Sequence, residues 1–191
     1  RLSAYFHFGM LSPLTVAREC VAIGGAGADK FLDELLVWRE VAWHFCHHAG
    51  VDLDSLAAVP EWARETLDEH RGDPRPGARS TLDLAGARTG DELWDAAQRS
   101  LLRHGELHNN LRMTWGKAII PWSASPEAAL ERLIDLNHRY AIDGRDPSSY
   151  GGLLWCMGQF DRPFPPAEPV TGELRGRSTE VHASRLDVER Y

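Results

Sequence analysis

The chain has 191 residues, of which 43% are hydrophobic and 26% charged, and its formal net charge is −7. This composition is typical of one globular domain with a sizeable core, and it excludes a disordered chain. No apolar run is long enough to span a membrane and the first residues lack the layout of a signal peptide, so we expect a soluble protein of the cytoplasm.

Helix signals dominate the first part of the sequence. Ser12-Pro13 is typical of an N-cap followed by a first-turn proline, and it predicts a helix that ends near Gly24. Apolar residues at helical spacing predict a second helix that continues to about Gly50. The buried face of this helix is expected to hold Phe31, Leu35, Trp38, Ala42 and Phe45.

The middle of the chain is also helical. Pro60 opens a short third helix. Thr89 and Glu92 have the spacing of a capping box ahead of a longer helix, for which Gly105 is a stop signal. A further helix is expected to begin at about His108.

The last part combines one more helix with irregular chain. Ser125-Pro126 caps a helix that is expected to continue to Tyr140. Turn formers at 142–152 indicate a loop that can line a ligand site, and the polar residues 171–191 indicate a tail wrapped over the domain. No segment alternates with a period of two, so the predicted fold class is all-α.

The sequence indicates neither a disulfide framework nor a metal site. Cys20, Cys46 and Cys156 lie far apart without CxxC spacing, which favours buried free thiols. His44 and His48 lie one helical turn apart, as zinc ligands can, but no third ligand is evident. A partly exposed helix end, where histidines suit the negative pole of the helix dipole, is the favoured interpretation, and we expect no metal.

Two polar groups are compatible with a ligand site or with ordinary structure. Glu34 and Trp38 are one turn apart, so a carboxylate and a flat ring are expected on one helix face, with Arg39 roughly 100° further round. Arg112 and Asp143 have the charges of an ion pair between a helix and a loop. On pattern alone, a surface salt bridge beside a core tryptophan is favoured for the first group.

Three of the seven tryptophans are the most suggestive. Trp115 and Trp122 lie two helical turns apart, roughly 10 Å along the axis, on nearly the same face. Trp94 belongs to the preceding helix, which is expected to pack as an antiparallel neighbour. The three indoles would form either a stack or relay or part of the core, and spacing alone favours the core.

Five segments together resemble one known family. They follow in order from Arg1 to about Phe164 and resemble the helical FAD-binding domain of the DNA photolyase and cryptochrome family. The resemblance is closest to class II cyclobutane pyrimidine dimer photolyases, whose LRMYW, LND-RY and DGRDPNGY signatures the chain follows. The segments are LSAYFHFGMLSP, FLDELLVWREVAWHF, DELWDAAQRSLLRHGELHNNLRMTWGKAIIPW, SPEAALERLIDLNHRYAIDGRDPSSYGG and WCMGQFDRPF.

The resemblance implies a domain organisation. Residues 1–164 would be the C-terminal part of the flavin-binding helical domain, and residues 165–191 a C-terminal tail that packs on this domain or extends from it. The N-terminal α/β antenna domain and the start of the flavin domain would lie outside this chain. The chain departs from the family signatures at Thr114, His138 and Ser148-Ser149.

The activity that the resemblance implies is light-driven repair of UV-damaged DNA. Photoexcited reduced FAD would donate an electron to a cyclobutane pyrimidine dimer flipped out of the duplex, as in photolyases generally. By position, Glu34 would hydrogen-bond the dimer and help to stabilise its radical anion, and Met113 would contact it. Trp38 and Trp155 would form the aromatic walls of the lesion pocket, where stacking contributes roughly 1–3 kcal/mol per base.

The resemblance also assigns residues around the flavin. Asn137 matches an asparagine beside flavin N5, where an amide can turn either a donor or an acceptor toward the ring. Arg112 with Asp143 matches a buried pair near the isoalloxazine, where an isolated charge would be costly. The flavin-lining positions as a whole are Leu2, Ser3, Arg39, Asn109, Arg112, Asp143 and Arg145.

The tryptophans gain a role by the same resemblance. Trp115 would be the first member of a photoreduction relay, which Trp94 and Trp122 would continue toward the surface. We expect a monomer that uses neither a metal nor a membrane. Two alternatives stay open, a cryptochrome-like blue-light photoreceptor without repair activity and a helical scaffold without flavin. Presence of all four lesion-contacting residues favours repair, because a sensor needs no lesion pocket.

Overall fold

The computed structural model describes residues 2–188, and within them all regular elements are helical apart from one isolated bridge between Glu168 and Gly172. The expected all-α class is therefore confirmed. The elements are α1 Ser3–His7, α2 Pro13–Ile23, α3 Gly25–Asp33, the π-helix η1 Glu34–Trp38, α4 Arg39–His48, the 3-10 turn η2 Leu56–Ala58, α5 Glu61–Glu69, α6 Thr81–Ala85, α7 Glu92–His104, α8 Asn109–Ile119, α9 Pro126–Tyr140, α10 Pro147–Cys156 and α11 Thr179–Ala183.

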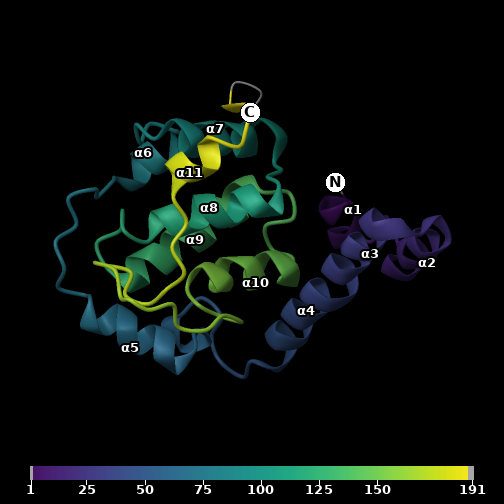
Figure 1. The fold of residues 1–191 in the computed structure, drawn as a ribbon, viewed down its shortest axis with the longest axis horizontal. Coiled ribbons are helices and arrows are strands. Elements are labelled where there is room, and N and C mark those ends of the chain that lie inside the picture. The colour runs from purple at the N-terminus through teal and green to yellow at the C-terminus, as the bar shows by residue number, and fades with distance from the viewer. Residues whose placement is uncertain (1, 189–191) are drawn as a thin grey trace.

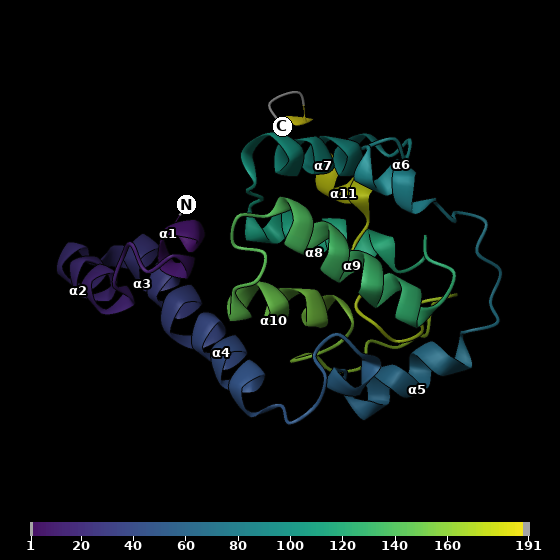
Figure 2. The same cartoon turned by 180° about the vertical axis from the view of Figure 1, so that it is seen from behind.

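The helices form two parts, which we call the arm and the body. The arm comprises α1 to α4 (residues 3–48) and extends to one side, whereas α5 to α11 form the body (Figures 1 and 2). The two parts meet where α4 packs against α10. Between residues 2 and 188, no helix is both long and apolar enough to cross a membrane.

The core of the body surrounds α8. This helix packs against α7, α9, α10 and α11. Leu111, Trp115 and Ile119 follow one another at one-turn intervals along α8, and each is at most 2% exposed. Gly116 lets α10 approach closely, since a Cβ there would lie 2.7 Å from the Cys156 Sγ atom. The sequence between Leu111 and Ile119 therefore builds the centre of the fold.

Most helix ends lie where the sequence predicts them. The side chains of Ser12 and Ser125 accept hydrogen bonds from the backbone at the starts of α2 and α9. Gly105 ends α7 with a φ of 64°, a left-handed conformation that glycine adopts without strain. The capping box was predicted wrongly, because Asp91 and not Thr89 caps α7. The Thr89 hydroxyl instead donates to Asp95 Oδ1 at 2.8 Å.

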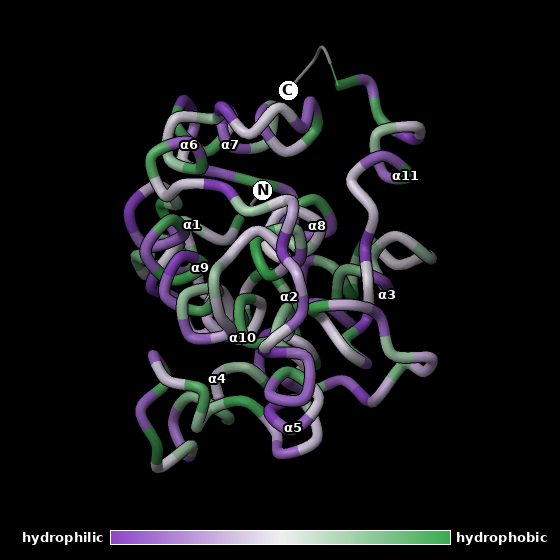
Figure 3. Tube along the Cα trace, turned by 90° about the vertical axis from the view of Figure 1, so that its left-hand side faces the viewer, coloured by the Kyte–Doolittle hydropathy of each residue, from purple (hydrophilic) through white to green (hydrophobic). Residues whose placement is uncertain are grey.

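The second predicted helix departs from a regular amphipathic helix. It is divided into α3, the π-helix η1 and α4, and its expected buried face is only partly buried. Leu35 and Ala42 are buried, whereas Trp38 is 39% exposed. A π-helix shifts the register of side chains around the axis, so spacing rules for an α-helix fail across it. No side chain of residues 3–33 is buried. Hydrophobic and hydrophilic residues are mixed along these arm helices, as they are along the body (Figure 3).

The predicted loop 142–152 is half helical. Its second part begins α10 at Pro147, and Asp146 caps this helix by accepting a hydrogen bond from the Ser148 amide. Gly151 therefore lies inside a helix and faces the arm, since a Cβ there would be 2.5 Å from the Ala42 Cβ. The glycine allows α4 and α10 to approach closely, and this contact positions the two halves of the candidate site.

The chain after α10 runs across the body in contact with α5, α7 and α8. Its backbone amides at Val170 and Glu173 donate to side chains near α5, and α11 packs on α7 and α8. Cys156 is buried as expected, whereas Cys20 and Cys46 are only half-buried; all three are free thiols. Residue 1 of the predicted domain and residues 189–191 of the predicted tail lie outside the described residues.

Candidate active site

A buried polar cluster lies where α8, α9 and α10 meet. The Arg112 guanidinium donates to Asp143 Oδ1 at 2.9 Å and to the Ser149 hydroxyl at 2.8 Å. The Asn137 amide donates to the same hydroxyl at 3.0 Å and to the Gly144 carbonyl at 2.9 Å. Arg112 and Asn137 are 7% and 0% exposed. The Ser149 hydroxyl thus joins Arg112 and Asn137, two of the residues predicted around the flavin, and Asp143 is held in the same cluster through Arg112.

Two atoms of this cluster have no partner among the described residues. Asn137 Oδ1, an acceptor, and Arg112 Nε, a donor, are both buried without a hydrogen bond. Buried polar atoms are rarely left unpaired, because each costs the desolvation of its group. A flavin ring carries both donors and acceptors along its polar edge, so the two orphaned atoms fit this cofactor chemically.

The other residues predicted at the flavin belong to two further groups. Arg39 begins α4, where its guanidinium lies 5.8 Å from the Phe6 ring and pairs with Glu40 at 2.6 Å. Leu2 and Ser3 stand at the start of α1, and Ser3 is exposed. The arm connects to the cluster through His7, whose Nδ1 lies 3.5 Å from Asp146 Oδ2. Exposed residues at the edge of the body complete the set, namely Asn109 and Arg145.

The two predicted aromatic walls come together across the junction of arm and body. The rings of Trp38 and Trp155 are 4.9 Å apart between centroids and inclined at 41°. Trp38 belongs to η1 and Trp155 to α10, so the pairing depends on the close approach of α4 and α10 described above. Trp155 also contacts Phe160 edge to face and donates from Nε1 to Asp161 Oδ2 at 3.3 Å.

The remaining predicted lesion contacts, Glu34 and Met113, belong to η1 and α8. Glu34 and Trp38 mark the two ends of η1, a type of element that is often found at functional sites. The Glu34 carboxylate pairs with Lys30 at 2.7 Å on an exposed surface. The sequence pattern favoured such a surface salt bridge, but it placed Trp38 in the core, whereas Trp38 is exposed. Met113 lies against α10, with its Cε 3.2 Å from where a Cβ on Gly152 would be.

The three singled-out tryptophans form one continuous contact chain. The rings of Trp115 and Trp94 are nearly parallel, with centroids 5.9 Å apart, and those of Trp94 and Trp122 are 5.6 Å apart at 70°. Trp94 Nε1 donates to the Trp115 carbonyl and Trp115 Nε1 donates to Gln98 Oε1. Trp115 and Trp94 are each 1% exposed, whereas Trp122 is half-buried. The order from interior to surface is therefore Trp115, Trp94 and Trp122.

Sequence reasoning missed the connecting role of Ser149 and a second polar group next to it. The Tyr150 hydroxyl donates to Asp54 Oδ1 at 2.6 Å, and its ring contacts the His138 imidazole at 4.8 Å between centroids. Burial and this hydrogen bond raise the pKa of Tyr150, and burial lowers the pKa of His138. His138 and Ser149 were visible in the sequence only as departures from the family signatures.

The histidines at the end of α4 stay close to one another. His44 and His48 have ring centroids 4.5 Å apart, and His47 also contacts His48. Among residues 2–188, no group of three or more histidine, cysteine, aspartate or glutamate side chains is arranged to hold a metal ion. His47 and His48 lie in the last turn of α4, the helix end at which the sequence places them.

Comparison with known proteins gives one consistent result. No protein-family model matches the chain. The deoxyribodipyrimidine photo-lyase of Methanothermobacter thermautotrophicus is 40% identical over 190 residues, covering 100% of this chain and 42% of that protein. The enzyme of the same name from Oryza sativa subsp. japonica is 40% identical over 194 residues, covering 100% and 38%. That from Thermus thermophilus is 33% identical over 176 residues, covering 87% and 38%.

The chain spans about two fifths of the length of the curated relatives that it matches, and the first two matches extend over all of it. The all-α architecture agrees with the helical domain expected from the sequence. The chain belongs to the DNA photolyase family.

Proposed function

We propose that the intact protein is a light-driven DNA lyase that splits cyclobutane pyrimidine dimers with FAD as its cofactor. One observation carries the proposal beyond family membership: α10 holds Ser149 of the buried polar cluster and Trp155 of the aromatic pair. Six residues of helix separate them by roughly 9 Å along the axis. A cofactor at the cluster and a base at the aromatic pair would thus be held by one rigid element.

The chain offers distinct groups to the cofactor. Asn137 Oδ1 would accept a hydrogen bond from the flavin and Arg112 Nε would donate one, which would satisfy both orphaned atoms. Asp143 holds the guanidinium of Arg112 in place, and Arg39 would contribute a positive charge from the arm. When bound and reduced, FAD supplies the light-activated electron that opens the dimer.

The lesion would bind on the other side of α10. Trp38 and Trp155 would stack on the two bases, and each base stacked on an aromatic ring contributes roughly 1–3 kcal/mol. The Glu34 carboxyl would hydrogen-bond the dimer, because its ion pair with Lys30 is exposed, screened by solvent and readily exchanged. Met113 would contact the dimer from α8, where its side chain lies against Gly152.

Irradiation of damaged DNA tests the proposed function directly. The intact protein with reduced flavin is mixed with an oligonucleotide that holds one thymine dimer, and the dimer is measured after blue light and after darkness. Loss of the dimer only in the light is expected. If flavin is bound and the dimers persist in the light, the cryptochrome-like photoreceptor becomes the favoured function. If the purified protein shows no flavin absorbance, the helical scaffold without flavin is favoured. A parallel oligonucleotide with a (6-4) photoproduct defines the lesion class.

The tryptophan chain leads to a separate expectation. Trp115→Phe should slow photoreduction of oxidised flavin, because phenylalanine is much harder to oxidise than tryptophan. Trp115 would be the first of the three tryptophans to pass an electron to the flavin. Repair by protein that is already reduced should be spared, since the dimer lies at the other end of the site. Flavin absorbance under continuous light measures the first property, and dimer loss measures the second. Photoreduction at the wild-type rate would mean that the three tryptophans serve only as core residues and not as an electron relay.

Four narrower statements remain predictions. The class II subtype, the monomeric state, the cytoplasmic location and the boundary between domain and tail at residue 164 are expected from the sequence. Gel filtration with light scattering tests the second. Limited proteolysis tests the last, because a cleavable tail after Phe164 would leave a stable helical fragment.

A further inference from the structure

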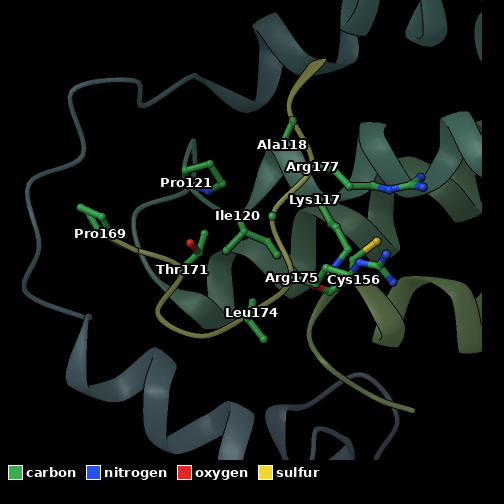
Figure 4. Close-up of a pocket in the computed structure, with 11 residues that line it drawn as sticks. Lys117, Ala118, Ile120, Pro121, Cys156, Pro169, Thr171, Leu174, Arg175 and Arg177 are labelled. Carbon is green, nitrogen blue, oxygen red and sulfur yellow. The ribbon is translucent and has the colours of Figure 1, made fainter. Parts of the chain in front are cut away.

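A cavity apart from the candidate active site lies between α8 and the chain that follows α10. It has a volume of about 260 Å³, compared with about 30 Å³ for one water molecule. Figure 4 shows Lys117 of α8 and Arg175 of the tail reaching toward Cys156 at the end of α10. Thr171 and Arg177 also line the cavity, whereas the tryptophan chain and the aromatic pair do not. It is therefore separate from the candidate active site.

All charged side chains that line this cavity are positive. Lys117, Arg175 and Arg177 line it, and no carboxylate of residues 2–188 does so. Lys117 is only 9% exposed, and its ammonium has one long hydrogen bond, at 3.5 Å to the Cys156 carbonyl, within the described chain. Burial is the main cause that lowers the pKa of Lys117; Cys156 and the Asp161 carboxylate oppose it, and Arg177 and Arg175 add to it. Burial also lowers the pKa of Arg177. Clustered like charges of this kind are costly unless an anion compensates them.

The cavity wall formed by the tail is held in a fixed position. The Val170 amide donates to Asp73 Oδ2 at 2.8 Å and the Glu173 amide donates to Thr66 Oγ1 at 3.0 Å. Gly172 lies between them with a φ of 56°, and a Cβ there would be 2.1 Å from Thr66 Oγ1. Only glycine fits this turn, which delivers Arg175 to the cavity. A site whose donors are positioned before binding loses less entropy when its ligand arrives.

We propose that this cavity binds a phosphate group, with the Lys117 ammonium and the Arg175 guanidinium as its principal ligands. Phosphate matches the site because guanidinium and ammonium groups are its preferred side-chain partners. Arg177 donates to the Asn110 carbonyl at 2.8 Å and contributes its charge from the side. The cavity admits a phosphate together with waters. The phosphate is either a free ion or one group of a longer ligand.

Equilibrium dialysis with radiolabelled inorganic phosphate tests the proposal on the intact protein. Ionic strength is held constant with chloride. Saturable binding of one equivalent is expected, and Lys117→Met and Arg175→Gln should each weaken it roughly tenfold or more, because each removes a charge-assisted hydrogen bond. Arg175 is exposed, so its replacement leaves the fold intact even if that of Lys117 does not. Arg185→Gln, an exposed arginine of the same tail that does not line the cavity, is the matched control.

Competition identifies the source of the phosphate. An undamaged single-stranded oligonucleotide that displaces the label would show that a nucleic-acid backbone supplies the group, and label that stays bound would show a site for the free ion. Absence of saturable binding at millimolar phosphate would overturn the proposal, as would wild-type binding by both Lys117→Met and Arg175→Gln. The assay needs no light, flavin or dimer, so its failure leaves the proposed lyase function standing.

Discussion

Replacing Arg112 with methionine is expected to lower the free energy of unfolding by about 3–5 kcal/mol, because it removes one partner of a buried ion pair. The side chains of Arg112 and Asp143 are only 8% and 13% exposed. Methionine fills much of the volume but leaves the Asp143 carboxylate without its cation and the Ser149 hydroxyl without one of its two donors. The loss is therefore mainly the desolvation of a charge that is no longer paired.

Urea unfolding followed by circular dichroism measures this loss. Arg139→Met is the matched control, since Arg139 pairs with Asp135 on the surface, where the two side chains are 55% and 37% exposed. Replacing Arg139 should lower the free energy of unfolding much less, because solvent screens an exposed ion pair. Combining Arg112→Met with Asp143→Leu should recover part of the stability, because no lone charge remains. Equal small losses for Arg112→Met and Arg139→Met would show that the buried cluster does not support the fold.

The sequence predicts helix ends well where one local interaction determines them. Ser12 and Ser125 each combine a capping hydroxyl with a following proline, and both cap helices in the structure. Gly105 ends α7 because its backbone adopts a left-handed conformation. Thr89 fails as a cap because Asp91 competes for the same helix start and has the better position. Local chemistry fixes these ends, and competition between neighbouring caps is settled only by the surrounding packing.

The arm shows why longer stretches are harder to predict. Apolar spacing across Phe31–Phe45 predicts one buried face, but η1 adds an extra residue to a turn and rotates Trp38 outward. Nothing in the hydrophobic pattern signals such a π-helix. The short helices α1, α6 and α11 also went unpredicted, because five residues are too few to define a period.

The candidate site was predictable in its members but not in its connections. The resemblance to photolyases picks out Arg112, Asn137 and Asp143, and the structure places the first two on Ser149, a residue noted only as a departure. Hydrogen bonds between residues far apart in the sequence depend on how α8, α9 and α10 pack. A single sequence contains no record of that packing, so nothing in it indicates that Ser149 connects Arg112 to Asn137.

Replacing Trp155 with alanine is expected to lower affinity for dimer-containing DNA by roughly ten- to a hundredfold, since stacking of a base on an aromatic ring contributes roughly 1–3 kcal/mol. Affinity for undamaged DNA should change little, because contacts to the phosphate backbone dominate non-specific binding. Trp155 contacts Trp38 at 4.9 Å and Phe160 at 6.1 Å between ring centroids, so alanine also removes support from both neighbours.

Binding in the dark separates this effect from any effect on the light reaction. Competition between damaged and undamaged duplexes, followed by fluorescence anisotropy at fixed salt, gives the ratio of the two affinities. Trp155→Phe should retain most of the discrimination, because it keeps an aromatic face while losing the hydrogen bond to Asp161. If Trp155→Ala stays folded and still discriminates damaged from undamaged DNA as the wild type does, the Trp38–Trp155 pair is not the lesion site, and the buried cluster alone would support a flavin-binding role.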